Sequence, residues 1–192
     1  MENHFHYVNE IILCHEGEAI FSVNGQDYRL GKNCIIFIGN LESHSVNITK
    51  LPYDRSVVLL SHTFVNRYLG MPLIVSMLSN HLPGFPYVFE LEDEEYGKIR
   101  EKAKTLRLEY ERKEPYWEEL VANQIKELLI TLYRKHPEFF DYVGDAQSSY
   151  TVMQVQLYIN ENFAEDITLE ALAERFYTSS STLSRDFKAQ LK

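Results

Sequence analysis

The first third of the chain alternates short apolar runs with turn residues, and this pattern constrains the fold more than any other feature. Six runs lie between residues 10 and 61: EIILCHE, EAIFSVNG, QDYRLG, NCIIFIG, HSVNITK and DRSVVLLSH. Asn24-Gly25 separates two of them and favours a type I′ hairpin turn, because both central positions of that turn need positive φ. Short strands at this spacing predict a small barrel or sandwich.

Helical periodicity replaces the strand pattern after His62. Residues 64–81 predict a helical insert, YVFELE a single returning strand, and residues 93–136 two consecutive amphipathic helices. The apolar positions of these two helices recur every three or four residues: Tyr96, Ile99, Ala103, Leu106 and Tyr110, then Val121, Ile125, Leu128 and Leu132. The pair either covers the barrel or forms a dimer interface, and the periodicity allows both.

The charge and the cysteines narrow the function classes. The formal net charge of −9 means that the whole molecule repels nucleic acid, so any DNA contact needs a local basic surface. Cys14 and Cys34 lie inside apolar strand-like runs, without metal or redox spacing, and we expect buried free thiols. No signal peptide and no apolar run of about 20 residues is present. We therefore expect a cytoplasmic protein with no membrane contact.

The last 40 or so residues read as three short helices. One apolar face is predicted for the first helix, formed by Val152, Val155, Ile159 and Phe163. Thr168 is a good N-cap for the second helix, and Ser179 for the third, in which Leu183 and Phe187 turn inward. Because few residues separate the last two helices, they must cross sharply, as in a helix-turn-helix.

The outward face of the third helix suits a DNA major groove. Ser181 and Ser184 are short enough to allow a close approach, and Arg185 can bind a guanine edge with two hydrogen bonds. Between Thr168 and Lys192 four basic side chains stand against three acidic ones, which is a weak electrostatic signal. On these residues alone, a three-helix unit that never contacts DNA remains the alternative.

The amino-acid sequence of this segment resembles that of a known protein family. ITLEALAERFYTSSSTLSRDFK is similar to the first helix-turn-helix of the AraC family of transcriptional regulators, with its Leu-Ser-Arg-x-Phe-Lys ending, and VMQVQLYINENFAEDI resembles the helix that precedes it. Members of this family usually carry a second helix-turn-helix. The chain ends where the connecting helix would begin, so we expect a truncated form.

The resemblance also implies roles for single residues. Ala173, Leu183 and Phe187 would be structural. The DNA-binding residues would be Ser181, Ser184 and Arg185 at the bases and Thr182 and Lys188 at phosphates.

A histidine-rich cluster opens the chain. His4, His6 and Glu10 share the parity of one strand face, and His44 follows in a later turn. This set suits a divalent transition metal. It is also similar to the cupin pattern His-x-His, three residues, Glu, six residues, Gly, although the second half of that pattern is degraded at residues 39–41. The AraC resemblance implies a cupin-like barrel in which such positions bind an effector. An effector pocket, a metal site and a purely structural role remain open.

Together these observations predict an α+β fold: a cupin-like β-barrel, a helical pair and a C-terminal helix-turn-helix. We expect a sensing domain with dimerisation helices at residues 1–136, a linker at 137–150 and a partial DNA-binding domain at 151–192. The function that the resemblance implies is ligand-responsive, sequence-specific DNA binding with a small effector such as a sugar, by a homodimer formed through residues 93–136. We expect no enzymatic activity and no cofactor. The alternative is a metal-dependent cupin enzyme with a helical appendage.

Overall fold

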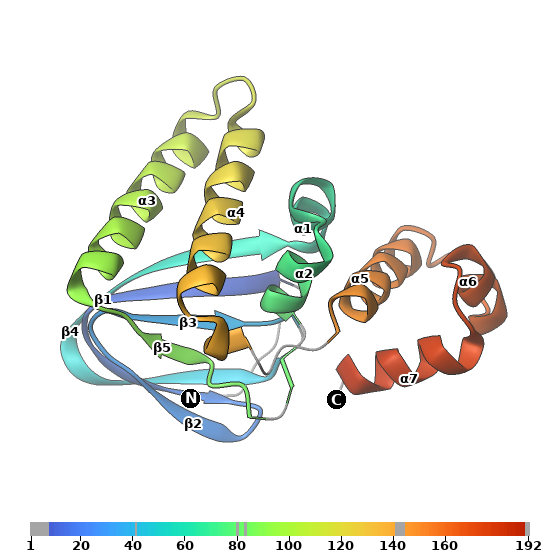
Figure 1. The fold of residues 1–192 in the computed structure, drawn as a ribbon, viewed down its shortest axis with the longest axis horizontal. Coiled ribbons are helices and arrows are strands. Elements are labelled where there is room, and N and C mark those ends of the chain that lie inside the picture. The colour runs from blue at the N-terminus through green and yellow to red at the C-terminus, as the bar shows by residue number, and fades with distance from the viewer. Residues whose placement is uncertain (1–7, 41, 80, 83, 141–144, 191–192) are drawn as a thin grey trace.

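The computed structural model describes residues 8–40, 42–79, 81–82, 84–140 and 145–190 (Figure 1). Five strands come mostly first: β1 (Val8–Val23), β2 (Gln26–Leu30), β3 (Cys34–Ile38), β4 (His44–Ser61) and, after two helices, β5 (Val88–Glu90). The helices are α1 (His62–Leu69), α2 (Pro72–Ser79), α3 (Asp93–Arg112), α4 (Trp117–Lys135), α5 (Ala146–Glu161), α6 (Leu169–Arg175) and α7 (Ser180–Gln190), and a 3₁₀ turn, η1 (Pro137–Phe140), follows α4.

The strands form one curled antiparallel sheet, a half-barrel built around β1. The first part of β1 pairs with β3, its last part pairs with β2, and β4 runs along nearly its whole length on the other side. β5 extends the sheet beyond β3. The turn at Asn24-Gly25 joins β1 to β2, with positive φ at both residues as predicted. The predicted α+β class, with a curled antiparallel sheet followed by helices, is confirmed.

The sequence predicted six short strands, but two pairs of them are merged into long, bent strands. β1 bends at Gly17, where its register against β4 shifts, and β4 bends opposite. Gly17 has a φ of +84°, and a Cβ there would lie 2.6 Å from the backbone oxygen of Lys50 and nearer still to that of Pro52. Because both strands bend together, their pairing continues past residues that read as turns.

The helical pair α3–α4 packs on the sheet. This is the first of the two roles predicted for it, that of covering the barrel. Tyr96 and Ile99 of α3 and Ile125 and Leu129 of α4 are buried in the main core. The predicted seam holds as far as Leu106, whereas Tyr110 is 60% exposed. Figure 1 shows why: the far ends of α3 and α4 project beyond the sheet, where no layer covers them.

The helix α5 joins the C-terminal helices to the rest of the molecule. Met153 and Leu157 of α5 belong to the main core, beside the buried helix α2, whereas Val155 belongs to a separate small core. Asp145 caps α5, accepting a 2.7 Å hydrogen bond from the Ser148 N–H. The segment 146–150, predicted as the end of a linker, is therefore helical.

The three C-terminal helices enclose the small core of Val155, Leu172, Ala173 and Leu183. Thr168 caps α6 and Ser179 caps α7, as predicted, through bonds of 3.2 and 3.1 Å from the backbone N–H groups of the residues three positions later. Phe163 does not extend the apolar face of α5, because that helix ends at Glu161, and its side chain is 82% exposed.

Candidate functional site

The predicted DNA-reading residues lie on the accessible face of α7. Ser181, Arg185 and Lys188 are exposed, and Thr182 and Ser184 are half-buried. The opposite face is anchored by Leu183, which is 2% exposed, and by Phe187. The side chains that could meet a ligand are thus separated from those that hold the helix.

The turn before α7 fixes its start. Tyr177 has a φ of +54°, and the Thr178 N–H donates to the carbonyl oxygen of Ala173 at 2.9 Å. The Ser179 hydroxyl donates to Oγ1 of Thr182 at 2.8 Å and lies 3.0 Å from Oγ of Ser181. The first turn of α7 therefore holds two of the candidate hydroxyls in place before any ligand arrives.

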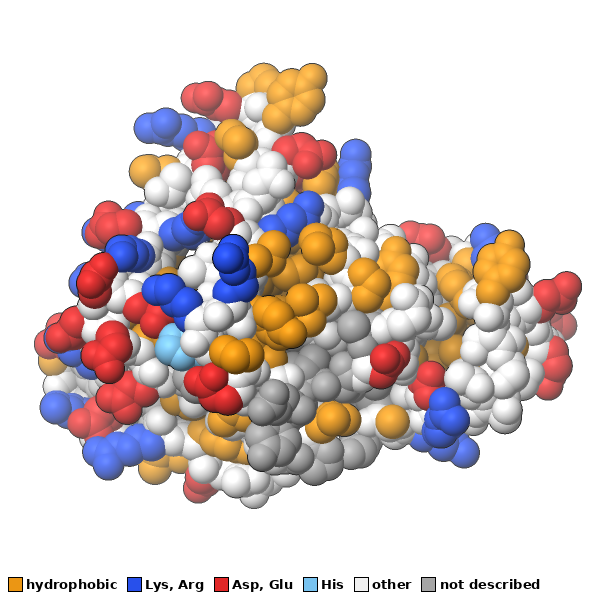
Figure 2. All heavy atoms as spheres, viewed as in Figure 1, with side chains coloured by type: hydrophobic (Ala, Val, Ile, Leu, Met, Phe, Trp, Pro, Cys, Tyr) orange, Lys and Arg blue, Asp and Glu red, His pale blue; other side chains and the backbone are white. Residues whose placement is uncertain are grey.

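Charge on α7 is mixed rather than uniformly basic. Arg185 pairs with its neighbour Asp186 at 3.1 Å, and the Arg185 side chain is 73% exposed. Figure 2 shows basic side chains over α7 and acidic ones at the α6 end of this unit. An ion pair this exposed contributes little stability and exchanges readily with solvent. The Arg185 guanidinium can therefore leave Asp186 for another anion at small cost.

Only two of the four predicted effector-binding residues lie among the residues that the structure describes. His4 and His6 lie outside the described residues. Glu10 and His44 are brought together, with Nε2 of His44 3.9 Å from Oε2 of Glu10, and both side chains are largely buried. The Nδ1–H of His44 donates to the backbone oxygen of Glu42 at 2.9 Å. That bond aims Nε2 at Glu10.

A metal at this position stays one of the alternatives that the sequence left open. Among the residues that the structure describes, no three His, Cys, Asp or Glu side chains are placed to hold a metal ion. The predicted set of four included His4 and His6, which fall outside those residues. Glu10 and His44 alone make a hydrogen-bonding pair that could bind a polar ligand.

A buried polar cluster beside β4 escaped the sequence analysis. Glu42 accepts bonds from the Gly39 N–H at 2.6 Å and from the Tyr87 hydroxyl at 2.5 Å, and His81 Nδ1 lies 3.1 Å from its carboxylate. Asn24 donates to the Tyr87 hydroxyl at 3.3 Å. These residues come from four separate segments. No spacing in the sequence links them, so the sequence alone did not predict this cluster.

The cluster keeps Glu42 ionised. Burial alone would raise the pKa of Glu42, but the charge and hydrogen bond of His81, with those of Tyr87 and Gly39, bring the pKa below its ordinary value. Burial, and then the Glu42 charge, raise the pKa of Tyr87 far above the usual range. Tyr87 therefore stays protonated and remains a donor to the carboxylate.

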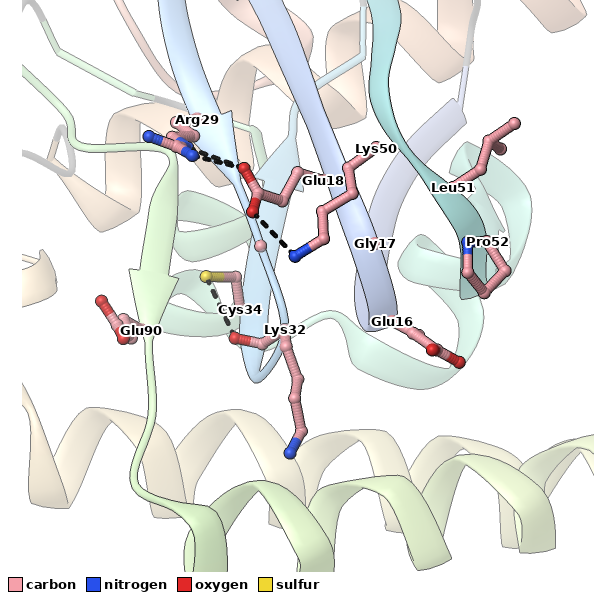
Figure 3. Close-up of a pocket in the computed structure, with 11 residues that line it drawn as sticks. Glu16, Gly17, Glu18, Arg29, Lys32, Cys34, Lys50, Leu51, Pro52 and Glu90 are labelled. Atoms are coloured by element: carbon pink, nitrogen blue, oxygen red, sulfur yellow. Dashed lines mark hydrogen bonds and ion pairs between the residues drawn. The ribbon is translucent and has the colours of Figure 1, made fainter.

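A cavity of about 570 Å³ lies at the bends of β1 and β4 (Figure 3). Glu18 occupies its wall and is bonded to both Arg29 and Lys50, so these three charges already satisfy one another. Cys34 reaches the same cavity and, like Cys14, is a buried free thiol, as expected. Burial raises the pKa of Cys14 to about 11, which leaves that thiol unreactive at neutral pH.

Comparisons with known proteins agree with this architecture. Residues 1–94 match the model of the AraC-like ligand binding domain, which confirms the resemblance seen in the sequence. No curated protein sequence matches the chain. Among the described residues no helix is long and apolar enough to cross a membrane.

Similar solved structures cover nearly the whole chain. Unsaturated fatty acid-bound ToxT from Vibrio cholerae strain SCE256 has a TM-score of 0.58 at 12% identity, with 98% of this chain and 68% of that one covered. ToxT from Vibrio cholerae O395 gives 0.53 at 13% identity, covering 97% and 67%. The AraC-like transcriptional activator CuxR gives 0.50 at 11% identity, covering 95% and 61%. At these identities the likeness establishes the fold.

Proposed function

We propose that this chain, whose first 94 residues match the AraC-like ligand binding domain, is a ligand-responsive regulator that binds specific DNA through α7. The observation that carries the proposal is the two-sided character of α7. Leu183 anchors the helix in the small core, while Ser181, Arg185 and Lys188 face solvent. A helix presented in this way by a preceding helix and a tight turn suits the major groove.

The residues on that face have three chemically distinct roles in the proposal. Ser181 and Ser184 let the helix approach the base edges closely, and Arg185 binds N7 and O6 of a guanine with two hydrogen bonds. Thr182 and Lys188 contact phosphates, which position the helix without reading sequence. Lys188 also lies in the last turn of α7, so its charge complements the helix dipole in the free protein.

The effector site is proposed within the half-barrel, at Glu10 and His44. The Glu10 carboxylate and Nε2 of the His44 imidazole lie 3.9 Å apart and can both accept hydrogen bonds from hydroxyl groups, which suits a polyhydroxylated ligand such as a sugar. His4 and His6 complete the proposed set. The fatty acid named in a ToxT structure supports a small molecule as the class of effector, although its chemistry differs from that of a sugar.

Dimerisation through α3 and α4 is the third part of the proposal. Leu108 of α3 and Leu120 of α4 are 47% and 49% exposed, and Tyr116 between the helices is 82% exposed. Figure 2 shows hydrophobic side chains at the projecting tip of this pair. Effector binding would then change how a dimer presents its two copies of α7, provided that the ligand prefers one of two arrangements.

Selection of DNA sequences, followed by titration, tests the reading role. Double-stranded oligonucleotides enriched by the wild-type protein from a random pool serve as the probe, and fluorescence anisotropy measures Kd at fixed salt. We expect Arg185→Ala to weaken binding about tenfold or more and to relax preference at one base pair. Lys188→Ala should weaken binding evenly across sequences and flatten the salt dependence.

Arg134→Ala is the matched control, because Arg134 is an exposed arginine of α4, far along the chain from α7. It should leave both affinity and preference unchanged. Equal DNA affinity and equal sequence preference for wild type and Arg185→Ala would show that Arg185 of α7 does not recognise bases.

A further inference from the structure

The second half of β4, residues 54–61, forms a free edge of the sheet. Among the described residues β4 pairs with β1 alone, so no strand lies on its other side. Figure 1 shows this part of β4 at the outer edge of the sheet, running towards α1 beneath the helical pair. In an antiparallel ladder every second residue directs its N–H and C=O away from the neighbouring strand. An edge of this kind is a template for a further strand.

A groove of about 1010 Å³ follows this edge. Its lining includes every residue from 54 to 61, although successive side chains of a strand point to opposite faces. A cavity that touches both sets of side chains lies along the edge of the strand. Across from β4 the lining comes from α1, α3 and α4 and includes Leu106 and Trp117. Neither Glu10 nor His44 lines the groove, and no residue of α7 does, so it is separate from the sites considered above.

One face of the edge offers apolar side chains. Val57 pairs with Ile12 of β1 and shares its face of the sheet. Leu59 lies two residues further along β4 on the same face, and the two side chains are 42% and 59% exposed. A strand added at this edge would therefore place every second side chain beside Val57 and Leu59.

The opposite face of the edge meets a row of positive charges on α3. Arg100, Lys104 and Arg107 are spaced four and three residues apart, so they share one side of the helix, and all three line the groove. Burial, above all, lowers the pKa of His15, and the charges of Arg100 and Lys104 lower it further. Since His15 contacts Ser56, these bases lie on the face of β4 opposite to Val57.

A chain of hydrogen bonds ties the edge strand to α3. The Tyr96 hydroxyl of α3 donates to the backbone oxygen of Cys14 at 2.7 Å, so it accepts from Nδ1 of His15 at 2.8 Å. Nε2 of His15 is then the acceptor for the Ser56 hydroxyl at 2.7 Å. The strand edge and the basic row are thus positioned relative to one another before any partner binds.

Not all of the positive charges in the groove are neutralised. Lys104 and Arg107 pair with Glu101 and Glu111 along their own helix, in exposed contacts that contribute little. For Arg100, no carboxylate lies within ion-pair distance in the described part of the chain. The lining has more basic side chains than acidic ones: Arg55, Arg67, Arg100, Lys104 and Arg107 against Asp54 and Glu118.

We propose that an extended acidic peptide of a partner protein pairs with this edge of β4 and adds a strand to the sheet. Its backbone bonds to the N–H and C=O groups that β4 directs away from β1. Because the side chains of a strand alternate, its acidic residues lie towards Arg100 and Lys104 on one face. Its apolar residues pack beside Val57 and Leu59 on the other. A segment that alternates acidic and apolar residues therefore fits both faces at once.

Charge disfavours a second copy of the chain as the added strand. In an antiparallel pair of β4 strands, corresponding faces of the two copies lie on the same side of the joined sheet. Each row of bases on α3 would then stand on the same side as its copy. Such a juxtaposition of like charges is unfavourable, whereas an acidic segment meets the row with opposite charge.

A synthetic peptide about eight residues long, of alternating Glu and Val, tests the proposal. Binding of the fluorescein-labelled peptide to the full-length protein is followed by anisotropy. Binding of the unlabelled peptide is followed by the emission of Trp117, which lines the groove and is the only tryptophan in the sequence. We expect saturable binding at one peptide per chain. A peptide with Lys in place of each Glu should bind about tenfold more weakly or not at all.

Methylation of the peptide backbone separates strand addition from attraction between charges. One version of the Glu-Val peptide carries an N-methyl group on every Glu, and another carries one on every Val. In an antiparallel ladder only one of these two sets directs its N–H groups towards β4. We expect one methylated peptide to bind about tenfold more weakly or worse, and the other to bind like the parent peptide.

The variant Arg100→Gln/Lys104→Gln should weaken binding of the Glu-Val peptide by about tenfold or more. Lys98→Gln is the control, since Lys98 lies on the same helix, outside the groove, and pairs with Glu94. Circular dichroism verifies that each variant is folded. The assay contains no DNA, so its result is independent of the reading role of α7.

Three outcomes would overturn the proposal. No saturable binding of the Glu-Val peptide would mean that the edge takes no strand of this chemistry. Equal binding of the two methylated peptides would reduce the interaction to a general attraction between charges. A change in Trp117 emission that follows protein concentration without any peptide, and that blocks peptide binding, would assign the edge to a second copy of the chain.

Discussion

Glu42 and His81 face one another beside β4, with Nδ1 of His81 3.1 Å from Oε2 of Glu42. The other ring nitrogen of His81 donates to the backbone oxygen of Met77 in α2 at 3.1 Å, and the ring stacks on Phe85 with centroids 3.9 Å apart. The pair therefore links the start of β4 to the end of α2. Since α2 packs against α5, this link lies on the route between the sheet and the C-terminal helices.

We expect Glu42 to make the stability of the protein sensitive to acid. Its pKa is depressed in the folded protein, so its contribution is complete above the unfolded value, about 4.5, and is lost as pH falls through the lower, folded pKa. Glu42→Gln should lower the free energy of unfolding by about 1–3 kcal/mol at pH 7, because buried bonds lose their charged acceptor. Urea denaturation at pH 7 and at about pH 4 measures both effects.

The difference between wild type and Glu42→Gln should shrink at the lower pH. Glu119→Gln, at an exposed carboxylate of α4, controls for the general effect of removing a negative charge. A difference that stays constant with pH would show that the Glu42 carboxylate is not preferentially ionised in the folded state.

Gly17→Ala and Gly97→Ala should shift stability in opposite directions. The added methyl at residue 17 would meet backbone oxygens of β4 at a positive φ, so we expect a loss of more than about 1 kcal/mol. Gly97 lies on the exposed face of α3 with nothing near its Cβ position, and alanine there should add about 1 kcal/mol. Thermal unfolding of both variants measures the contrast. A neutral Gly17→Ala would mean that the bend in β1 is looser than described.

Leu183→Ala should unfold the C-terminal unit before the rest. The side chain is 2% exposed in a core with few other buried members, and such a truncation costs about 2–5 kcal/mol. Leu51→Ala, at a 77% exposed site, should be nearly neutral. Hydrogen exchange read by mass spectrometry should show lost protection in α6 and α7 with the sheet unaffected. Uniform loss across the chain would contradict a separate small core.

Replacing exposed leucines at the tip of α3–α4 should dissociate the proposed dimer. Leu108→Glu/Leu120→Glu places two charges on the surface offered for self-association, while both positions are open enough for the monomer to tolerate them. Sedimentation velocity should show a dimer for wild type and a monomer for the variant. A variant that remains dimeric would move the interface elsewhere.

Local signals in the sequence predicted the helices and strands well, but not where strands continue through a bend or where a helix ends. Caps at Thr168 and Ser179 and the turn at Asn24-Gly25 depend on a few adjacent residues, so the sequence contains their cause. The bend at Gly17 depends on β4 bending opposite, some 35 residues away, and a reader of local patterns takes it for a turn. Phe163 kept the helical period, but α5 ends before it.

The candidate sites differ in the same way. The accessible face of α7 follows from helical periodicity, so its residues could be named in advance. The cluster at Glu42 combines side chains from segments that only the fold brings together.

The helix α5 is held by two cores at once, with Met153 and Leu157 in the larger and Val155 in the smaller. The two faces of one helix thus contribute to both cores. A displacement of α5 at Met153 would therefore also change the packing of Val155 against Leu183.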